Sequence, residues 1–171
     1  MREATVASSL RLIRDSWLHR VDYRVDGETL PRMSKWRLVA TPLFQIFVHR
    51  FYGPDWSQDP HDHPADFVSI GLAGSYVEAV YDESGGVVDQ KTWRAPWFRR
   101  FPARHIHRTV GVGPKGALTV CFVGPIRQSW SFYIGSEQIQ SRDYVKSFRS
   151  KRADKGALKP VATTHHDSVT K

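Results

Sequence analysis

The stretch Asp59-Pro60-His61-Asp62-His63-Pro64 decides how this sequence of 171 residues is interpreted. Its two histidines stand two positions apart, and alternation along an extended backbone sends both imidazoles to the same face. The flanking prolines fix φ, which lowers the entropy lost when the side chains are held in place. A single strand can therefore offer two nitrogen ligands to one metal ion.

A second cluster, Pro102-Ala103-Arg104-His105-Ile106-His107, follows an aromatic run further along the chain. Neutral imidazole is a good ligand for Fe, Mn, Ni, Cu and Zn, and three imidazoles on one face leave coordination positions open. We predict that His61, His63 and one histidine of the second cluster, His107 or His105, hold one divalent transition metal, with iron favoured over Mn, Ni, Zn or Cu. His105 shares a face with His107 by alternation and stays the alternative ligand.

Around these clusters the sequence is a succession of short β-type runs separated by turn signals. The first run, Leu43 to Tyr52, is β-branched and aromatic, and the last ends at Ile134. Turns are expected at Ala73-Gly74 and at Gly113-Pro114-Lys115-Gly116. Because no helical pattern intervenes, the fold class is all-β, an antiparallel sandwich or barrel.

Helices are expected only at the two ends of this β region. Four apolar residues near the N-terminus are spaced by four, three and four positions, so they would share one face of a helix; they are Val6, Leu10, Ile13 and Trp17. We expect this helix to continue through His19. A short helix is expected around Arg142 to Arg149. The chain then divides into an N-terminal helix and lead-in (1–41), a β-barrel (42–135), a short C-terminal helix (136–152) and a basic tail (153–171).

The net charge of +8 belongs mainly to the C-terminal end. From Arg142 to Lys171 eight Lys and Arg side chains stand against three Asp, a surplus of five positive charges. The tail has too little apolar content to fold alone, and we expect it to be disordered beyond about Arg152. A solubilising tail is the favoured interpretation, and an arm that binds nucleic acid or another polyanion is the alternative.

Composition excludes several kinds of site. Cys121 is the only cysteine, so neither an intramolecular disulfide nor a thiolate cluster can form within the chain. No stretch approaches the length of apolar sequence that crosses a bilayer, and the N-terminus lacks a signal-peptide core. We expect a cytoplasmic protein without a membrane partner, in which a metal must rest on histidines and carboxylates.

The two histidine clusters resemble the two motifs of the cupin family. His61-x-His63, followed by an apolar strand and Leu72-Ala73-Gly74, is similar to the first cupin motif, and Pro102-x-Arg104-x-x-His107 is similar to the second. More narrowly, the stretch His61 to Ser69 resembles a group of small cupin-like proteins of bacteria and phages. The resemblance implies a single-domain double-stranded β-helix, a jelly-roll barrel, in which His107 is the last metal ligand.

Departures from the family pattern leave two questions open. Asp66 lies only three residues past His63, closer than the carboxylate ligand of the family. Alternation points it away from the ligand face unless a bulge intervenes, so we expect it to orient a ligating imidazole rather than to bind the metal. Arginines near the second motif either bind an anionic substrate or form a solvated strand face. They are Arg94, Arg99, Arg100, Arg104, Arg108 and Arg127.

The resemblance favours a metal-binding cupin enzyme that acts on a small organic substrate, and the nearby arginines would suit an anionic one. Iron would imply dioxygenase-type chemistry, and another metal a Lewis-acid isomerase. The alternative is a non-catalytic cupin module that binds a ligand or a partner, with the basic tail as a polyanion-binding arm. A homodimer is left open by the sequence.

Overall fold

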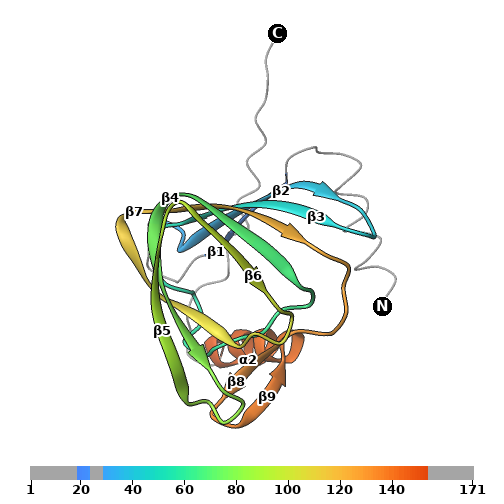
Figure 1. Ribbon diagram of the computed structural model, residues 1–171. Coiled ribbons are helices and arrows are strands. Elements are labelled where there is room, and N and C mark those ends of the chain that lie inside the picture. The colour runs from blue at the N-terminus through green and yellow to red at the C-terminus, as the bar shows by residue number, and fades with distance from the viewer. Residues whose placement is uncertain (1–18, 24–28, 154–171) are drawn as a thin grey trace.

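Two long antiparallel strands, β4 (Phe67–Tyr81) and β7 (His107–Val123), lie side by side through most of the fold. The computed structural model describes residues 19–23 and 29–153, and most of the remaining strands extend outward from these two (Figure 1). They are β1 (His19–Tyr23), β2 (Met33–Ala40), β3 (Gln45–Phe51), β5 (Val87–Arg94), β6 (Trp97–Phe101), β8 (Ser131–Ile134) and β9 (Glu137–Gln140). Helix α2 (Ser141–Ala153) follows β9.

Paired glycines bend the two long strands. Gly74 in β4 has φ 75° and Gly116 in β7 has φ 72°, a left-handed conformation that glycine adopts without steric cost. A Cβ atom at Gly74 would lie 1.8 Å from the carbonyl oxygen of Gly116, so the two strands cross in close contact here. The predicted turns at these positions are therefore wrong. The glycines bend continuous strands, and pairing resumes beyond each bend with a shifted register.

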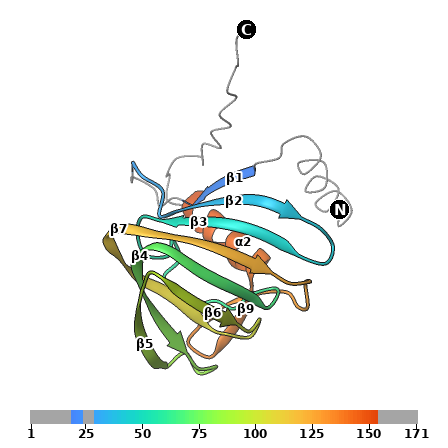
Figure 2. The same cartoon turned by 45° about the horizontal axis from the view of Figure 1, so that its top comes forward.

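The bends divide the sheet into two layers. The first layer contains β1, β2, β3, the C-terminal half of β7, the N-terminal half of β4, and β6. The second contains β5 with the other halves of β4 and β7, and isolated bridges from His61 to His107 and to Phe132 connect it to the β8–β9 hairpin. Figure 2 shows the first layer turned toward the viewer, with β5 curling away below it. The two layers enclose the interior in which the site lies.

The ends of the chain only partly follow the sequence analysis. The C-terminal helix is present as α2, whose Tyr144 ring stacks on Phe132 with centroids 3.9 Å apart. The N-terminal helix expected over residues 6–17 lies outside the described residues. The prediction that this helix continues through His19 is wrong, because the backbone of His19 pairs with Arg37 at the start of β1. Strands β1 and β2 thus precede residue 42, where we expected the barrel to begin.

Within the described residues no helix has the length and apolar character needed to cross a membrane.

Candidate metal centre

Backbone pairing brings His61 and His107 together. The N–H of each residue donates to the carbonyl oxygen of the other at 3.0 Å, so the two residues stand directly opposite each other in an antiparallel bridge. Directly opposed residues point their side chains to the same face. The two imidazole rings accordingly lie with their centroids 5.1 Å apart, although the residues are far apart in the sequence.

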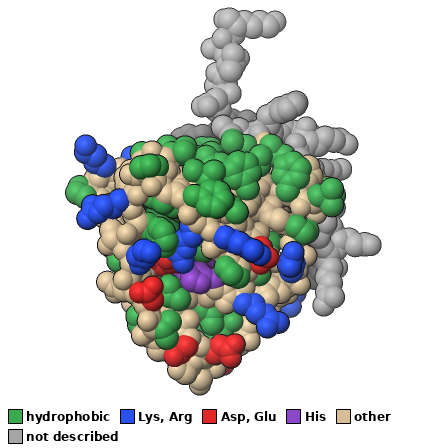
Figure 3. All heavy atoms as spheres, viewed as in Figure 1, with side chains coloured by type: hydrophobic (Ala, Val, Ile, Leu, Met, Phe, Trp, Pro, Cys, Tyr) green, Lys and Arg blue, Asp and Glu red, His purple; other side chains and the backbone are tan. Residues whose placement is uncertain are grey.

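His63 joins this pair through alternation along the same extended segment. Its N–H donates to the carbonyl oxygen of Ala103 at 2.9 Å, which fixes the segment beside the loop that leads to His107. Nε2 of His63 lies 2.8 Å from Nε2 of His107. One nitrogen from each of His61, His63 and His107 falls within 4.8 Å of the others. Histidine side chains are visible near the centre of the face in Figure 3.

Glu78 is the carboxylate that contacts this group. Its side chain is fully buried on β4, and its Oε1 lies 2.6 Å from Nδ1 of His107. An N–H at Nδ1 that donates to this carboxylate leaves the lone pair of Nε2 directed toward His63. The same carboxylate contacts Nε2 of His105 at 3.0 Å and accepts hydrogen bonds from Trp93 and Arg99. Glu78 therefore fixes the orientation of the His107 ring.

Sequence reasoning assigned this orienting role to Asp66, and the structure gives Asp66 other contacts. Its Oδ1 accepts a hydrogen bond from the N–H of Ala103 at 2.7 Å, and its Oδ2 pairs with the exposed side chains of Arg100 and Arg127. Among the described residues no hydrogen bond joins Asp66 to an imidazole, so we correct that expectation. The physical reason is the one that alternation suggested: Asp66 points away from the histidines and stabilises the loop before His105.

Asp62, between the two histidines of the first cluster, points to the opposite side from them. Its buried carboxylate accepts hydrogen bonds from the N–H of Ser131 at 2.6 Å, from Gln128 and from the hydroxyl of Tyr133. These contacts attach the segment to strand β8. Asp62 thus helps to hold the backbone on which His61 and His63 are placed, a role that sequence reasoning missed.

His105 lies beside the three histidines, within the hydrogen-bond network of Glu78. Its Nε2 is 2.9 Å from a guanidinium nitrogen of Arg99 as well as 3.0 Å from Glu78. Arg99 itself shares the inward face of β6 with Trp97 and Phe101, so this arginine does not belong to a solvated strand face. A second group of candidate ligand atoms, those of Glu78, His105 and His107, arises from this network. Because Arg99 already neutralises Glu78, we interpret this second group as a hydrogen-bond network that orients His107 and not as a second metal site.

Burial keeps the histidines of the site neutral. It lowers the pKa of His61, and it lowers the pKa values of His63 and His107 well below the ordinary value, with further lowering from neighbouring imidazoles. Burial and the charge of Arg99 lower the pKa of His105 to about 4. Only neutral imidazole offers a lone pair to a metal, so these residues are in the required state. The buried Nδ1 of His61 has no hydrogen-bond partner within the described residues, which fits a free ligand atom.

The three histidines line a cavity of about 380 Å³ between the two layers of the barrel. Its walls are largely aromatic; they include Phe51, Phe67, Phe101, Trp130 and Phe132. Polar side chains of the first layer also face it, among them Lys35, His49 and Thr119. An apolar cavity with a few placed polar groups is the usual form of a small-molecule site.

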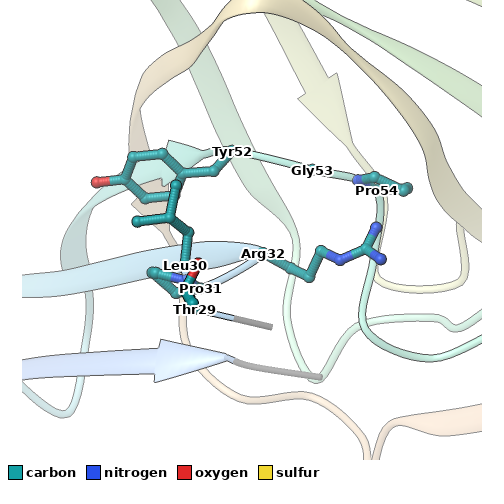
Figure 4. Close-up of a pocket in the computed structure, with 7 residues that line it drawn as sticks. All are labelled: Thr29, Leu30, Pro31, Arg32, Tyr52, Gly53 and Pro54. Atoms are coloured by element: carbon teal, nitrogen blue, oxygen red, sulfur yellow. The ribbon is translucent and has the colours of Figure 1, made fainter. Parts of the chain in front are cut away.

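A larger hollow, of about 490 Å³, lies away from the histidines (Figure 4). It is lined by Thr29, Leu30, Pro31, Arg32, Tyr52, Gly53 and Pro54. Arg32 is the one charged side chain among these seven, and the set contains neither a histidine nor a carboxylate. The cavity between the layers, and not this hollow, combines candidate ligands with enclosed space.

No protein-family model matches the sequence, and no curated protein matches it. Solved structures do match. A PAC13 variant from Streptomyces, solved with uridine, aligns with a TM-score of 0.50 at 9% identity, over 74% of this chain and 91% of that one. A protein with a double-stranded β-helix domain from Klebsiella pneumoniae gives 0.49 at 13% identity, over 66% and 90%. KdgF from Halomonas sp. gives 0.43 at 14% identity, over 61% and 95%.

At such low identities the likeness concerns the fold alone. The strands of this chain pair in two bent layers, which is the arrangement of a double-stranded β-helix. The cupin resemblance that the two histidine clusters indicated is confirmed at this level.

Proposed function

We propose that the protein is a metal-dependent cupin enzyme that acts on a small organic molecule. One divalent transition metal would be held by His61, His63 and His107, with iron favoured over Mn, Ni, Zn or Cu. The observation that carries this proposal is the convergence of three neutral imidazoles, one of them oriented by a buried carboxylate, on the wall of an enclosed cavity.

The chain's own residues have distinct tasks in this proposal. Glu78 holds the hydrogen of His107 at Nδ1, so that Nε2 is free to bind. The aromatic walls exclude water and surround the apolar part of a substrate. A metal bound by three nitrogens retains open positions, and it would supply Lewis-acid chemistry, or oxygen chemistry if it is iron. In this proposal Asp66 neither binds the metal nor orients a ligating imidazole.

Reconstitution tests the proposal. The metal-free protein is incubated separately with Fe(II), Mn, Ni, Zn and Cu, dialysed, and analysed for bound metal. We expect one ion per chain for at least one of these metals. The protein loaded with that metal is then screened with small organic acids, sugars and nucleosides, and with an oxygen electrode if the metal is iron. His107→Ala serves as the inactive control.

Two outcomes would change the assignment. A wild type that binds none of the five metals would overturn the metal site itself. A stoichiometric metal complex that binds small molecules but converts none of them would favour the alternative, a non-catalytic ligand-binding cupin module. If nucleic acid then bound in a salt-sensitive way, and truncation after Arg152 abolished that binding, the basic tail would be the polyanion-binding arm.

A further inference from the structure

Lys35 is a partly buried cation on the wall of the cavity. It lies on β2, in the first layer of the barrel, and its Nζ stands 3.9 Å from the centroid of the Phe47 ring. Within the described part of the chain, no carboxylate forms an ion pair with Lys35. Removing an ammonium group from water without a counter-charge is costly, and desolvation lowers the pKa of Lys35 to about 8; the aromatic ring offsets only part of that cost. A ligand with a negative charge would therefore be stabilised beside Lys35.

His49 stands beside Lys35 and presents a second unsatisfied group. The two residues are direct cross-strand partners of β2 and β3, so their side chains share the face that lines the cavity. Nε2 of His49 is buried and has no hydrogen-bond partner among the described residues. Burial and the charge of Lys35 lower the pKa of His49 to about 3, so its imidazole is neutral.

Cys121 contacts the other ring nitrogen of His49. Its Sγ lies 3.6 Å from Nδ1 of His49, and burial raises the pKa of the thiol, which therefore keeps its proton. A thiol that donates to Nδ1 leaves the hydrogen of the imidazole on Nε2, where it can be donated into the cavity. Thr119, opposite His49 on β7, adds a hydroxyl to the same wall. The wall thus combines one cation with a neutral imidazole, a thiol and a hydroxyl.

This wall and the three histidines belong to opposite layers of one cavity. Lys35, His49 and Thr119 are on the first layer, whereas His61 and His107 are on the second. Both sets of side chains line the same cavity. The carboxylate that lines the cavity, Asp55, accepts a hydrogen bond from the N–H of Thr109 at 2.8 Å, on the histidine side. Asp55 is thus on the opposite side of the cavity from Lys35, His49 and Thr119, and the positive charge of Lys35 is not neutralised by it.

We propose that Lys35 and His49 anchor the carboxylate of a small organic acid whose other end reaches the three histidines. The proposal rests on the proposed function, because it names the substrate class of that site. A single ammonium group balances one negative charge, whereas a phosphate dianion would carry a second charge into an apolar cavity without a partner. The aromatic walls between the two layers suit an apolar or aromatic body between the carboxylate and the reacting end.

Benzoate and its neutral isostere benzamide are the probes for this anchor. Binding of each is measured by isothermal titration calorimetry to metal-free wild type, to Lys35→Met and to Lys91→Met. Lys91 is a matched control, because it also lies over an aromatic ring, that of Trp93, but does not line the cavity. We expect wild type and Lys91→Met to prefer benzoate by about 10- to 100-fold, the usual strength of a charge-assisted hydrogen bond, and Lys35→Met to lose that preference.

A second measurement does not depend on the folding of a variant. In wild type carrying isotopically labelled lysine, benzoate should shift the nuclear magnetic resonance signals of the Lys35 side chain and leave those of Lys91 in place, whereas benzamide should shift neither. Wild type that binds benzoate no better than benzamide, or a folded Lys35→Met that keeps the preference, would overturn the proposal.

Repeating the titration with His61→Ala separates this proposal from that of the metal site. If His61→Ala loses metal and keeps the benzoate preference, both proposals stand. If wild type binds metal but shows no benzoate preference, the anchor alone fails. If wild type binds no metal but prefers benzoate through Lys35, the metal site fails and the anchor remains.

Discussion

Replacing Glu78 with Gln tests the support of the histidine site most sharply. The fully buried carboxylate of Glu78 contacts four side chains: it accepts from Trp93 Nε1 at 3.0 Å and from Arg99, and it lies 3.0 Å from His105 Nε2 and 2.6 Å from His107 Nδ1. Gln has nearly the same shape but no charge, and its amide nitrogen is a donor that faces these donors.

The expected loss of stability in Glu78→Gln follows from the positive charge that Arg99 would retain. The side chain of Arg99 is only 14% exposed, so Glu78→Gln leaves a buried guanidinium without its counter-charge. Breaking one side of a buried pair costs about 3–5 kcal/mol, and we expect the free energy of unfolding of the metal-free protein to fall by that amount. Losing the partner that orients His107 should also weaken metal affinity by about 10- to 100-fold.

The two effects are measured separately, by urea unfolding in the presence of a chelator and by competition of the folded protein with a chelator of known affinity. Asp66→Asn is the control, because Asp66 contacts the loop before His105 and no imidazole, and it should leave metal affinity unchanged. The reasoning would be refuted if Glu78→Gln kept its metal affinity and lost less than about 1 kcal/mol, or if Asp66→Asn weakened metal binding as strongly as Glu78→Gln.

Two further predictions concern stability. His49→Gln should make the free energy of unfolding fall less steeply at acid pH. The pKa of His49 in the folded protein is about 3, below the ordinary value, so between about pH 6.5 and 3 unfolding takes up a proton at His49. In urea titrations over this range, wild type should lose up to about 1.4 kcal/mol per pH unit more than the variant. Parallel pH profiles would contradict this. Gly74→Ala should lower the free energy of unfolding by at least about 2 kcal/mol, because the residue has φ 75° and the new Cβ would lie 1.8 Å from the Gly116 oxygen. Gly135→Ala should lower it clearly less, because that residue has φ 59° but no atom lies within 4 Å of the new Cβ. Thermal unfolding measures both losses. Equal losses at the two glycines would show that the crossing of the strands is not tight.

The fold was predictable where a local pattern decides it. Alternation and turn residues located the β-type runs, and the clusters at His61 and His107 indicated the double-stranded β-helix. The same patterns could not distinguish a hairpin turn from a bend within a continuous strand. Gly74 and Gly116 satisfy both interpretations, and only the pairing of β4 with β7 on each side of the bend decides between them.

The site was predictable along one strand but not across strands. Alternation places His61 and His63 on one face, and the family resemblance selected His107. Glu78 lies near the end of β4, whereas Asp66 precedes that strand, and the contact of Glu78 with His107 depends on a register that shifts between Val77 and Glu78. The available signal was an acidic residue at an apolar position of an otherwise apolar strand. Lys35 gave no comparable signal, because it reaches the cavity only through the pairing of β2 with β3.

The central claim is that three histidines hold one ion, and the metal content of single variants tests it most directly. Wild type, His61→Ala, His63→Ala, His107→Ala and His105→Ala are reconstituted with the metal that wild type binds best, dialysed and analysed for metal per chain. We predict one ion in wild type, loss of most of the metal in each of the first three variants, and a smaller loss in His105→Ala, whose Nε2 contacts Arg99 and Glu78. A folded His61→Ala or His107→Ala protein that kept a full equivalent of metal would contradict the account.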